Sequence, residues 1–304
     1  MNEFSVTILG SSSAIPTSTR FPSAQLVSHN YKSFLVDCGE GTQIQLRKNQ
    51  IRFSKIHHIF ISHMHGDHFF GLIGLISTFN LLGRKMALHI YAPAEVKKAI
   101  EVQLEVSQTK LNFTINYHFL AFDGIHLLFE NKELEVYSFP LNHSIPTCGF
   151  LFKEKTHPRK IRKNILTKYA IEDSKFEGIK KGDDFIDKEG NIVDNEVLTT
   201  AGVPRKSYAY CSDTAYSKDL AHYIQGVDLV YHECSFMEDM RATAEEKKHS
   251  TTFDAARVAV EAGAKGLIIG HYSARYKDIK PLLKETQSKF EHTRIATEGL
   301  KLEL

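Results

Sequence analysis

The segment Ser62-His63-Met64-His65-Gly66-Asp67-His68 decides which kind of fold this chain adopts. It follows the apolar run Ile59-Phe60-Ile61 and places three imidazoles and one carboxylate within six positions. Burying these groups without partners is costly, whereas neutral imidazole and carboxylate are good zinc ligands. We interpret the segment as a metal-binding cluster at the end of a short strand. The alternative is a histidine-rich surface turn with incidental metal affinity.

The spacing inside the cluster indicates how many metal ions it serves. Residues two apart in an extended segment point to the same side, so His63 and His65 share a direction. Asp67 and His68 open the helix that is predicted to follow, and they point elsewhere. This division favours two adjacent metal ions over one.

Length and composition allow one large domain. With 304 residues and 42% apolar residues it can bury a large core, and many α/β enzymes of this length form one unit. The net charge of +2 gives no general affinity for nucleic acid, so any such surface must be local. The cysteines form no C-x-x-C pair, which argues against a cysteine-based zinc module and for a reducing cytosol. We expect neither a signal peptide nor a membrane span, because no apolar run approaches roughly 18 residues.

Side chains of metal-binding type also follow several later strands of the predicted structure. His143 comes after the strand predicted at 134–140, Asp213 after 207–211 and His271 after 266–270. In open α/β sheets such residues gather, because the loops at the strand ends converge there. A two-metal site with a shared carboxylate needs about the seven candidates found: His63, His65, Asp67, His68, His143, Asp213 and His271.

Other segments allow two interpretations each. The small-residue loop 11–17 is either a phosphate cradle or, as we prefer, a plain connection, because it lacks the glycines and lysine of a P-loop. Asp37 is either the partner of a ligand imidazole or a helix cap. The apolar segment 69–82 predicts a buried helix ended by Gly83, and strands at 116–120, 124–130 and 134–140 are expected in meander order.

Residues 153 to about 205 differ from the rest in composition. Basic residues crowd the first sixteen positions, where Glu154 is the single acid, and apolar periodicity is weak. We expect an inserted arm with little core of its own in an otherwise single domain spanning 1–304. The arm is either a solvated surface excursion or a local contact for nucleic-acid phosphates, since clustered Lys and Arg release counterions there.

The motifs together resemble the metallo-β-lactamase superfamily and, within it, the ribonuclease Z family of tRNA 3′-processing endonucleases. The His-Glu and His-Ser-Thr elements and the arm narrow the resemblance to that family, and it covers essentially the whole chain. The residues that carry it are Leu9-Gly10 with Pro16, Asp37 to Gln43, His63 to His68, Asn142-His143-Ser144, Ser212-Asp213-Thr214, His232-Glu233, His249-Ser250-Thr251 and His271 to Tyr276.

The resemblance implies a fold and a metal arrangement. The fold is an αββα sandwich, in which two mixed sheets are flanked by helices, with a protruding arm. Two zinc ions per chain are implied, although the ligands do not exclude manganese. The first ion takes His63, His65 and His143, the second takes Asp67, His68 and His271, and Asp213 bridges the two.

The resemblance also implies a function, namely a cytoplasmic, homodimeric endoribonuclease that removes 3′ trailers from precursor tRNA and leaves a tRNA 3′-hydroxyl. Asp67 takes the proton of the attacking water, His249 protonates the leaving 3′-oxygen and Glu233 orients His249. Arg275 contacts a substrate phosphate. The arm grips the body of the folded tRNA, reaching from one subunit toward substrate at the other, through Arg159, Lys160, Arg162, Lys163, Lys180 and Lys181.

Each of these roles has a plainer alternative. His249 is otherwise a histidine at a helix entry, Glu233 a structural hydrogen-bond acceptor and Arg275 a member of a surface ion pair. The arm segment 170–182 keeps glycines and a lysine pair but lacks the Pro-Pro-Gly-Pro hinge motif of many relatives. The whole chain is otherwise a dinuclear hydrolase of small phosphodiesters, sulfate esters or lactones, or an inactive RNA-binding scaffold, against which the full ligand set argues.

Overall fold

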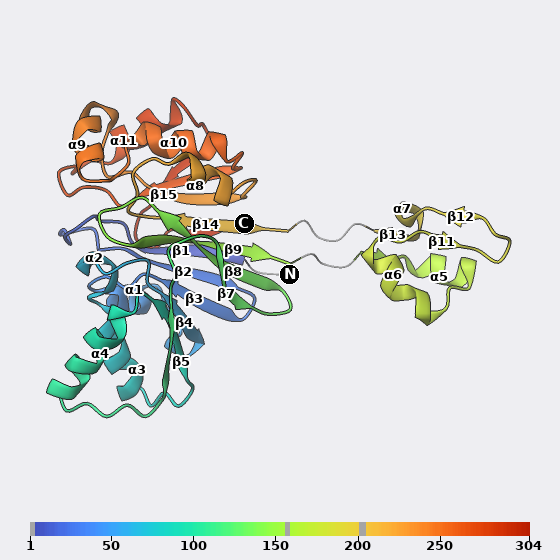
Figure 1. Ribbon diagram of the computed structural model, residues 1–304, viewed down its shortest axis with the longest axis horizontal. Coiled ribbons are helices and arrows are strands. Elements are labelled where there is room, and N and C mark those ends of the chain that lie inside the picture. The colour runs from blue at the N-terminus through green and yellow to red at the C-terminus, as the bar shows by residue number, and fades with distance from the viewer. Residues whose placement is uncertain (1–3, 156–158, 201–204) are drawn as a thin grey trace. The chain divides into compact units, whose positions relative to one another are not determined.

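Two seven-stranded sheets face each other, and helices cover both outer faces (Figure 1). The computed structural model describes residues 4–155, 159–200 and 205–304. It divides into two compact units, which are treated separately below. Unit 1 comprises Met1–Glu130, Glu135–Phe152 and Lys206–Leu304, and unit 2 comprises Asn131–Leu134 and Lys153–Arg205.

The first sheet has the strand order β18-β1-β2-β3-β4-β5-β6. Its strands β1 to β3 pair antiparallel and β3 to β6 pair parallel. The strands are β1 Phe4–Gly10, β2 Ala24–His29, β3 Lys32–Val36, β4 Ile56–Phe60, β5 Leu88–Ala92, β6 Ile115–Phe119 and β18 Lys301–Glu303. The helices of this half are α1 Thr42–Lys48, η1 Phe53–Lys55, α2 Gly66–Phe69, α3 Leu72–Leu81 and α4 Glu95–Val106.

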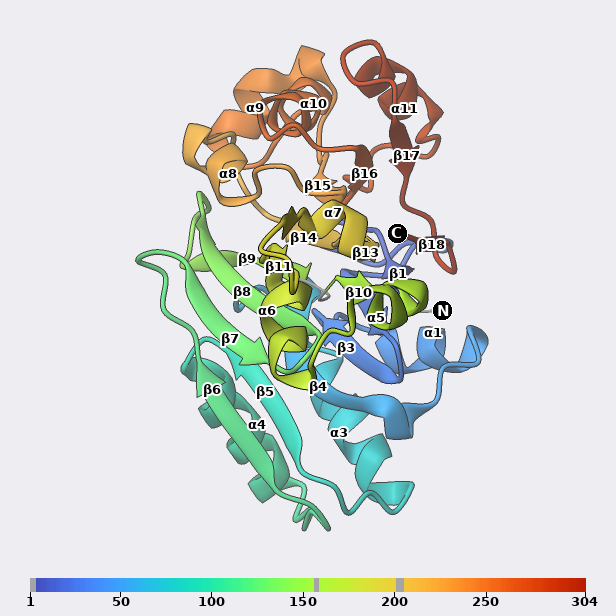
Figure 2. The ribbon, with the colours of Figure 1, turned by 90° about the vertical axis from the view of Figure 1, so that its right-hand side faces the viewer.

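The second sheet has the order β17-β16-β15-β14-β9-β8-β7, in which β14 to β17 pair parallel (Figure 2). Its strands are β7 His126–Glu130, β8 Leu134–Leu141, β9 Thr147–Glu154, β14 Ser207–Cys211, β15 Leu229–Glu233, β16 Gly266–Gly270 and β17 Thr293–Ile295. Its helices are α8 Lys218–Tyr223, η3 Glu238–Met240, α9 Arg241–Glu246, α10 Thr252–Glu261 and α11 Lys280–Gln287.

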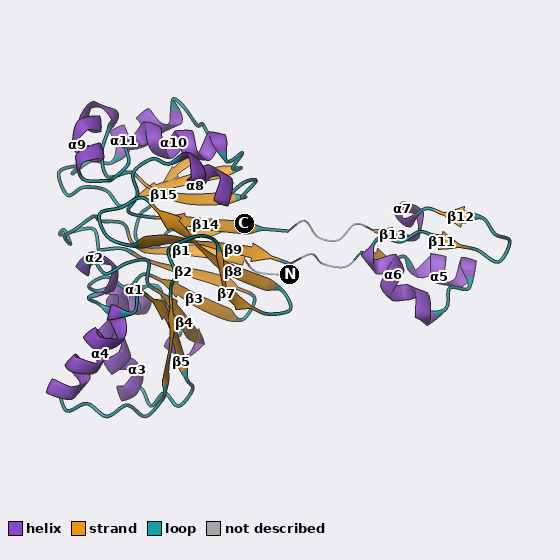
Figure 3. Ribbon diagram, viewed as in Figure 1, coloured by secondary structure: helices purple, strands orange, loops and turns teal. Residues whose placement is uncertain are grey.

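Three apolar layers hold the sandwich together. One lies between the first sheet and its helices, where Ile59, Leu75 and Ile100 are among the buried residues. Another lies between the second sheet and its helices. Aromatic rings fill the space between the sheets, where Phe60 of β4 lies 5.4 Å from Phe150 of β9. The order helix, sheet, sheet, helix (Figure 3) is the predicted αββα sandwich.

The predicted meander of three strands is wrong. β6 pairs parallel with β5 in the first sheet, whereas β7 and β8 form an antiparallel pair in the second. The chain therefore passes from one layer to the other between β6 and β7. Alternating apolar residues indicate that a strand is half-buried but not which strand it joins, so the pattern could not reveal this crossing. The helix predicted at 69–82 is also shorter than expected, because α2 and α3 are separate elements.

Unit 2 has a small apolar core of its own. Its buried members are Ile165, Ile171, Ile179, Val193 and Leu198. They come from short elements, the longest of which has seven residues, and from the loop before η2, so no window long enough to show periodicity exists. The elements are β10 Lys160–Ile161, α5 Lys163–Tyr169, η2 Asp173–Lys175, α6 Phe176–Lys181, β11 Phe185–Ile186, β12 Ile192–Val193, α7 Asn195–Leu198 and β13 Thr199–Thr200.

The helices within the described ranges are all too short or too polar to pass through a bilayer.

Candidate metal centre

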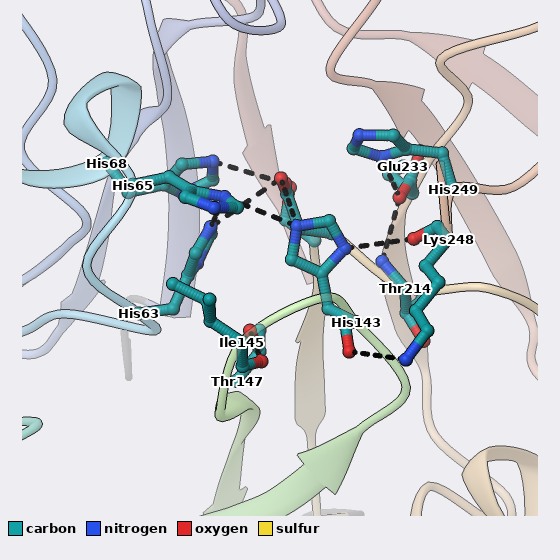
Figure 4. Close-up of polar contacts among 12 residues, drawn as sticks. His63, His65, His68, His143, Ile145, Thr147, Thr214, Glu233, Lys248 and His249 are labelled. Carbon is teal, nitrogen blue, oxygen red and sulfur yellow. Dashed lines mark hydrogen bonds and ion pairs between the residues drawn. The ribbon is translucent and has the colours of Figure 1, made fainter. Parts of the chain in front are cut away.

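The seven predicted ligand side chains come together at the ends of strands from both sheets. His63 and His65 follow β4, His143 follows β8, Asp213 follows β14 and His271 follows β16. Asp67 and His68 lie in α2, the helix that opens after β4. Figure 4 shows four of these histidines, contributed by the two halves of unit 1, turned toward one another.

The backbone is strained where it delivers three of the central carboxylates and imidazoles. Asp37, Asp213 and His271 have φ angles of 55°, 60° and 57°. Non-glycine residues in this left-handed region cost about 1–3 kcal/mol each and persist where the surrounding structure requires them, often at functional sites. Each follows a strand by one or two positions, so the strain turns the chain sharply at the rim of the sheets.

The first group of donors consists of three imidazoles. Nδ1 of His65 lies 3.1 Å from Nε2 of His63 and 3.2 Å from Nε2 of His143. Oδ2 of Asp213 lies 3.6 Å from both of those Nε2 atoms. One donor atom of each of these four residues falls within 4.8 Å of the others.

The second group combines two imidazoles with a carboxylate. Nε2 of His68 lies 3.4 Å from Nε2 of His271 and 3.5 Å from Oδ2 of Asp67. Oδ1 of Asp213 is 3.1 Å from the first of these nitrogens and 3.0 Å from the second. Asp213 therefore turns one carboxylate oxygen to each group, as a bridging ligand would.

Hydrogen bonds orient four of the ligand imidazoles. Nδ1 of His68 donates to Oδ2 of Asp37 at 2.7 Å. Nδ1 of His143 donates to the carbonyl of Lys248 at 2.9 Å, as Figure 4 shows. Serine hydroxyls accept from the other two, Ser62 Oγ from His63 (2.9 Å) and Ser235 Oγ from His271 (3.0 Å). In its neutral form, with the proton on Nδ1, each ring presents an unprotonated Nε2 to the centre, as metal binding requires.

Asp37 thus contacts a ligand imidazole, which was one of its two predicted roles, and it caps no helix. Its carboxylate also accepts from the backbone and hydroxyl of Ser62 and from the hydroxyl of Tyr210. The side chain is fully buried, so these hydrogen bonds offset the cost of taking its charge out of water.

The charge balance of the site suits cations. Burial lowers the pKa of His63 well below its ordinary value, which keeps that imidazole neutral. For His68 the neighbouring carboxylates outweigh burial and raise the pKa. Burial disfavours the charged form of Asp67, yet the adjacent His68 and His271 hold its pKa below the usual range. Neutral imidazoles and ionised carboxylates are the donors that divalent transition metals take, so the residues present fit such ions.

His249 and Glu233 lie beside the second group of donors. Nδ1 of His249 donates to Oε1 of Glu233 at 2.8 Å, and the same oxygen accepts from the backbone N–H of Thr214 at 2.7 Å. Burial disfavours the charged imidazole, but the Glu233 carboxylate outweighs it and raises the pKa of His249 to about 9. The ring of His249 lies 5.0 Å from that of His143.

The site opens into a cavity of about 590 Å³. The 11–17 loop, which we preferred to interpret as a plain connection, forms part of its wall. The backbone N–H of Ala14 in this loop donates to Oδ2 of Asp67 at 2.8 Å. The lining residues are Ser13, Ala14, Ile15, Pro16, Glu40, His65, Gly66, Asp67, Phe70, His143, Ser144, Asp213, Lys247 and His249.

Arg275 is absent from the lining of this cavity. Its guanidinium lies 5.1 Å from the centroid of the Phe236 ring, and its Nε donates to the hydroxyl of Ser273 at 3.3 Å.

In unit 2, Arg159 and Arg162 donate to Oγ1 and to the carbonyl of Thr199. Lys181 pairs with Glu177 at 2.7 Å, and the remaining predicted contact residues, Lys160, Lys163 and Lys180, are exposed.

A ribonuclease Z of Porphyromonas gingivalis (strain W83) is 44% identical over 304 residues, which covers 100% of both chains. The chain belongs to the ribonuclease Z family. The predicted membership is thereby confirmed over its whole length.

Solved structures agree with this assignment. Human tRNase Z, short form, is 26% identical, has a TM-score of 0.71 and covers 98% of each chain. YhfI of Bacillus subtilis, a metallo-β-lactamase fold protein, has a TM-score of 0.70 at 19% identity over 100% of both chains and shares the fold. A family model described as anti-Pycsar protein Apyc1 matches residues 4–158, the part that carries His63 to His68 and His143. In this metallo-β-lactamase fold, the His and Asp cluster is a site for divalent metal.

Proposed function

We propose that this chain is a cytoplasmic endoribonuclease that removes 3′ trailers from precursor tRNA with two zinc ions bound by seven side chains. Membership in the ribonuclease Z family makes it a tRNA 3′-processing endoribonuclease. The observation that carries the two-ion proposal is Asp213, which directs one oxygen to the His63, His65 and His143 group and the other to the second group.

The metal ions supply the electrophilic chemistry, because a divalent pair acidifies water and neutralises the charge of a phosphodiester. Asp67 has two duties in the proposal. It completes the second donor group and accepts the proton of the attacking water. Its Oδ2 is held by the backbone N–H of Ala14 at 2.8 Å, which limits its rotation and keeps one oxygen in a defined position beside the cavity.

His249 protonates the departing ribose 3′-oxygen, so the reaction leaves a tRNA 3′-hydroxyl. The support is geometric, since its imidazole lines the cavity and its Nδ1 is engaged by Glu233 at 2.8 Å. That hydrogen bond leaves Nε2 as the nitrogen available to substrate. Glu233 in turn is fixed by the N–H of Thr214, so it acts as a positioning residue for His249.

Unit 2 is proposed as an arm inserted in the single 1–304 domain that grips the body of the tRNA. Lys160, Lys163 and Lys180 are exposed, and Arg159, Lys160 and Lys180 border a hollow of about 500 Å³ whose lining, among the described residues, contains no acidic side chain. Such a surface attracts phosphates irrespective of sequence, as recognition of folded RNA by its shape requires. Arg162, Lys181 and Arg275 are included as further contacts, and like Arg159 each also has a partner within the chain.

The finer assignments rest on the resemblance and on chemistry. Imidazole-rich donors favour zinc, with manganese as the competitor. A homodimer, in which the arm of one subunit serves the cavity of the other, is carried over from the family. All four cysteines, Cys38, Cys148, Cys211 and Cys234, are unpaired and buried, which fits a reducing cytoplasm.

The deciding experiment uses a tRNA transcript with a 3′ extension. The purified protein with zinc or manganese is expected to cut just past the discriminator base and to leave a 3′-hydroxyl. Absence of that product with both metals would count against the function. Hydrolysis of only a small chromogenic phosphodiester would leave the dinuclear hydrolase of small substrates. Fewer than one tightly bound metal ion per chain would favour the inactive scaffold.

A further inference from the structure

We propose that Ile15 and Phe70 form an apolar clamp that holds a nucleobase adjacent to the scissile phosphodiester. The inference rests on the proposed function, because it identifies which part of the RNA the cavity takes in beside the metal centre. It assigns a binding role to two residues that the catalytic chemistry does not use.

The first observation is that two large apolar side chains are exposed at the cavity. Ile15 is 57% exposed and Phe70 is 59% exposed, although both belong to types that are normally buried. Of the strongly exposed large apolar side chains in the described ranges, these two line the cavity that contains Asp67 and His143. Apolar side chains left open to water beside a metal centre indicate a ligand with an apolar face.

The backbone of the loop that carries Ile15 is held by hydrogen bonds. Ser12 Oγ donates to the carbonyl of Ile15 at 2.8 Å, and the N–H of the preceding residue, Ala14, donates to Asp67. This loop is therefore tied to the candidate metal centre. A rigid apolar surface loses little conformational entropy when a ligand packs on it.

Phe70 is fixed by a different device. Its ring lies against the backbone of Gly66, where an added Cβ would come within 2.2 Å of the ring. It also meets the ring of Phe69 edge to face at 5.0 Å. Gly66 is thus required for the seat of the ring, and it sits between two of the proposed ligands, His65 and Asp67.

The cavity lining offers two kinds of surface. Ala14, Ile15, Pro16 and Phe70, from the first half of unit 1, are apolar. Polar groups come from both halves, and His143, Lys247 and His249 of the second half add the basic ones. A nucleotide has the same division, because its base offers an apolar face and its phosphate an anion. Stacking of an unpaired base on protein side chains strengthens binding about 5- to 150-fold, and the 3′ end of a tRNA precursor is where unpaired bases occur.

The test combines protein variants with modified RNA. Precursor tRNA is prepared intact, with an abasic nucleotide just 5′ of the cleavage site, or with one just 3′ of it. Phe70→Ala is expected to lower kcat/KM for the intact precursor about 5- to 150-fold. An abasic nucleotide at the clamped position is expected to lower kcat/KM of the wild-type protein by a similar factor. In Phe70→Ala the same abasic nucleotide is expected to lower kcat/KM by no more than about a further twofold, because the clamp is already lost. Coupling at the 5′ or the 3′ nucleotide identifies which base is held.

Matched variants separate the clamp from loss of folding. Phe119, 55% exposed on β6, lies outside the cavity, and Phe119→Ala is expected to cleave all three RNAs as wild type does. Phe70→Trp is expected to stay within threefold of wild type, whereas Phe70→Leu and Ile15→Ala lose activity. If the kcat/KM loss from Phe70→Ala multiplies with the loss from the abasic nucleotide at both positions, the two act independently and the clamp is overturned. Failure of wild type to cut the intact precursor would overturn the proposed function instead.

Discussion

At the residue scale, the candidate metal centre depends on hydrogen bonds that fix its histidine rings on the side away from the centre. In four of its histidines Nδ1 hydrogen-bonds to another group of the protein and Nε2 faces the centre. The candidate ligands are predictable from sequence, because each is a metal-type side chain in the loop or short helix that follows an apolar strand. Their partners are not, since Ser62, Ser235 and the carbonyl of Lys248 carry no pattern that distinguishes them from other serines and carbonyls.

Asp67→Ala separates chemistry from grip. We expect turnover of precursor tRNA to fall at least a thousandfold while the Kd for tRNA changes less than threefold, because the proposed grip lies in unit 2. The measurements are single-turnover cleavage and filter binding. Glu40→Ala, which alters another carboxylate of the same cavity, is the control and is expected to retain activity. An affinity loss as large as the rate loss would contradict this separation.

His249→Ala tests the proposed acid. We expect cleavage to slow about 100- to 10,000-fold, the usual contribution of a positioned proton donor, with both metal ions retained. Metal analysis of the purified variant is the check. Loss of metal would mean that His249 is a ligand, since one of its ring nitrogens lies within 4.8 Å of donor atoms of Asp213 and His271.

His58 makes stability depend on pH. Burial lowers the pKa of His58 to about 3, against an ordinary value of 6.5, so between these values only the unfolded chain binds the proton. The free energy of unfolding should therefore fall as the pH drops below 6.5, by at most about 1.4 kcal/mol per pH unit. His58→Phe, which suits a ring packed 4.7 Å from Phe129, should show a shallower fall. Denaturation of the two metal-free proteins at pH 7 and 5 compares them, and equal falls would contradict the assignment.

At the scale of elements, sequence predicts what an element is better than what it joins. Thr251 caps α10 in a capping box with Asp254. Such a motif is local, so four residues suffice to predict it. The partner of β6 depends on a crossing between layers, which no local pattern encodes. The same limit hid the core of unit 2, whose five buried residues are gathered from separate short elements.

Thr251→Ala measures what this cap contributes. Its hydroxyl accepts from the N–H of Asp254 and also donates to Glu238 at 2.7 Å, so we expect the free energy of unfolding to fall by about 1–2 kcal/mol. Ser217 is the matched control, because it precedes α8 without a side-chain capping bond. Ser217→Ala should change the free energy by less than about 0.5 kcal/mol. Equal effects of the two substitutions in urea denaturation would show that the capping box contributes nothing to stability.

At the scale of the molecule, the catalytic sandwich and the basic unit 2 have separate cores, so they can be tested apart. Replacing residues 159–200 by a four-residue Gly-Ser linker removes that core together with all six predicted arm contacts. We expect tRNA processing to fall at least a hundredfold, while hydrolysis of a small chromogenic phosphodiester stays within threefold. Equal loss of both activities would mean that unit 2 supports the sandwich rather than the substrate.

The segment 159–200 of unit 2 begins and ends on neighbouring strands, since Lys160 of β10 is the register partner of Thr200 of β13. A segment whose two ends meet in this way closes on itself, and its host needs only one short loop to do without it. Selection can therefore lengthen, trim or replace the proposed RNA-gripping surface as a cassette, leaving the spacing of the loops that carry the candidate ligands untouched.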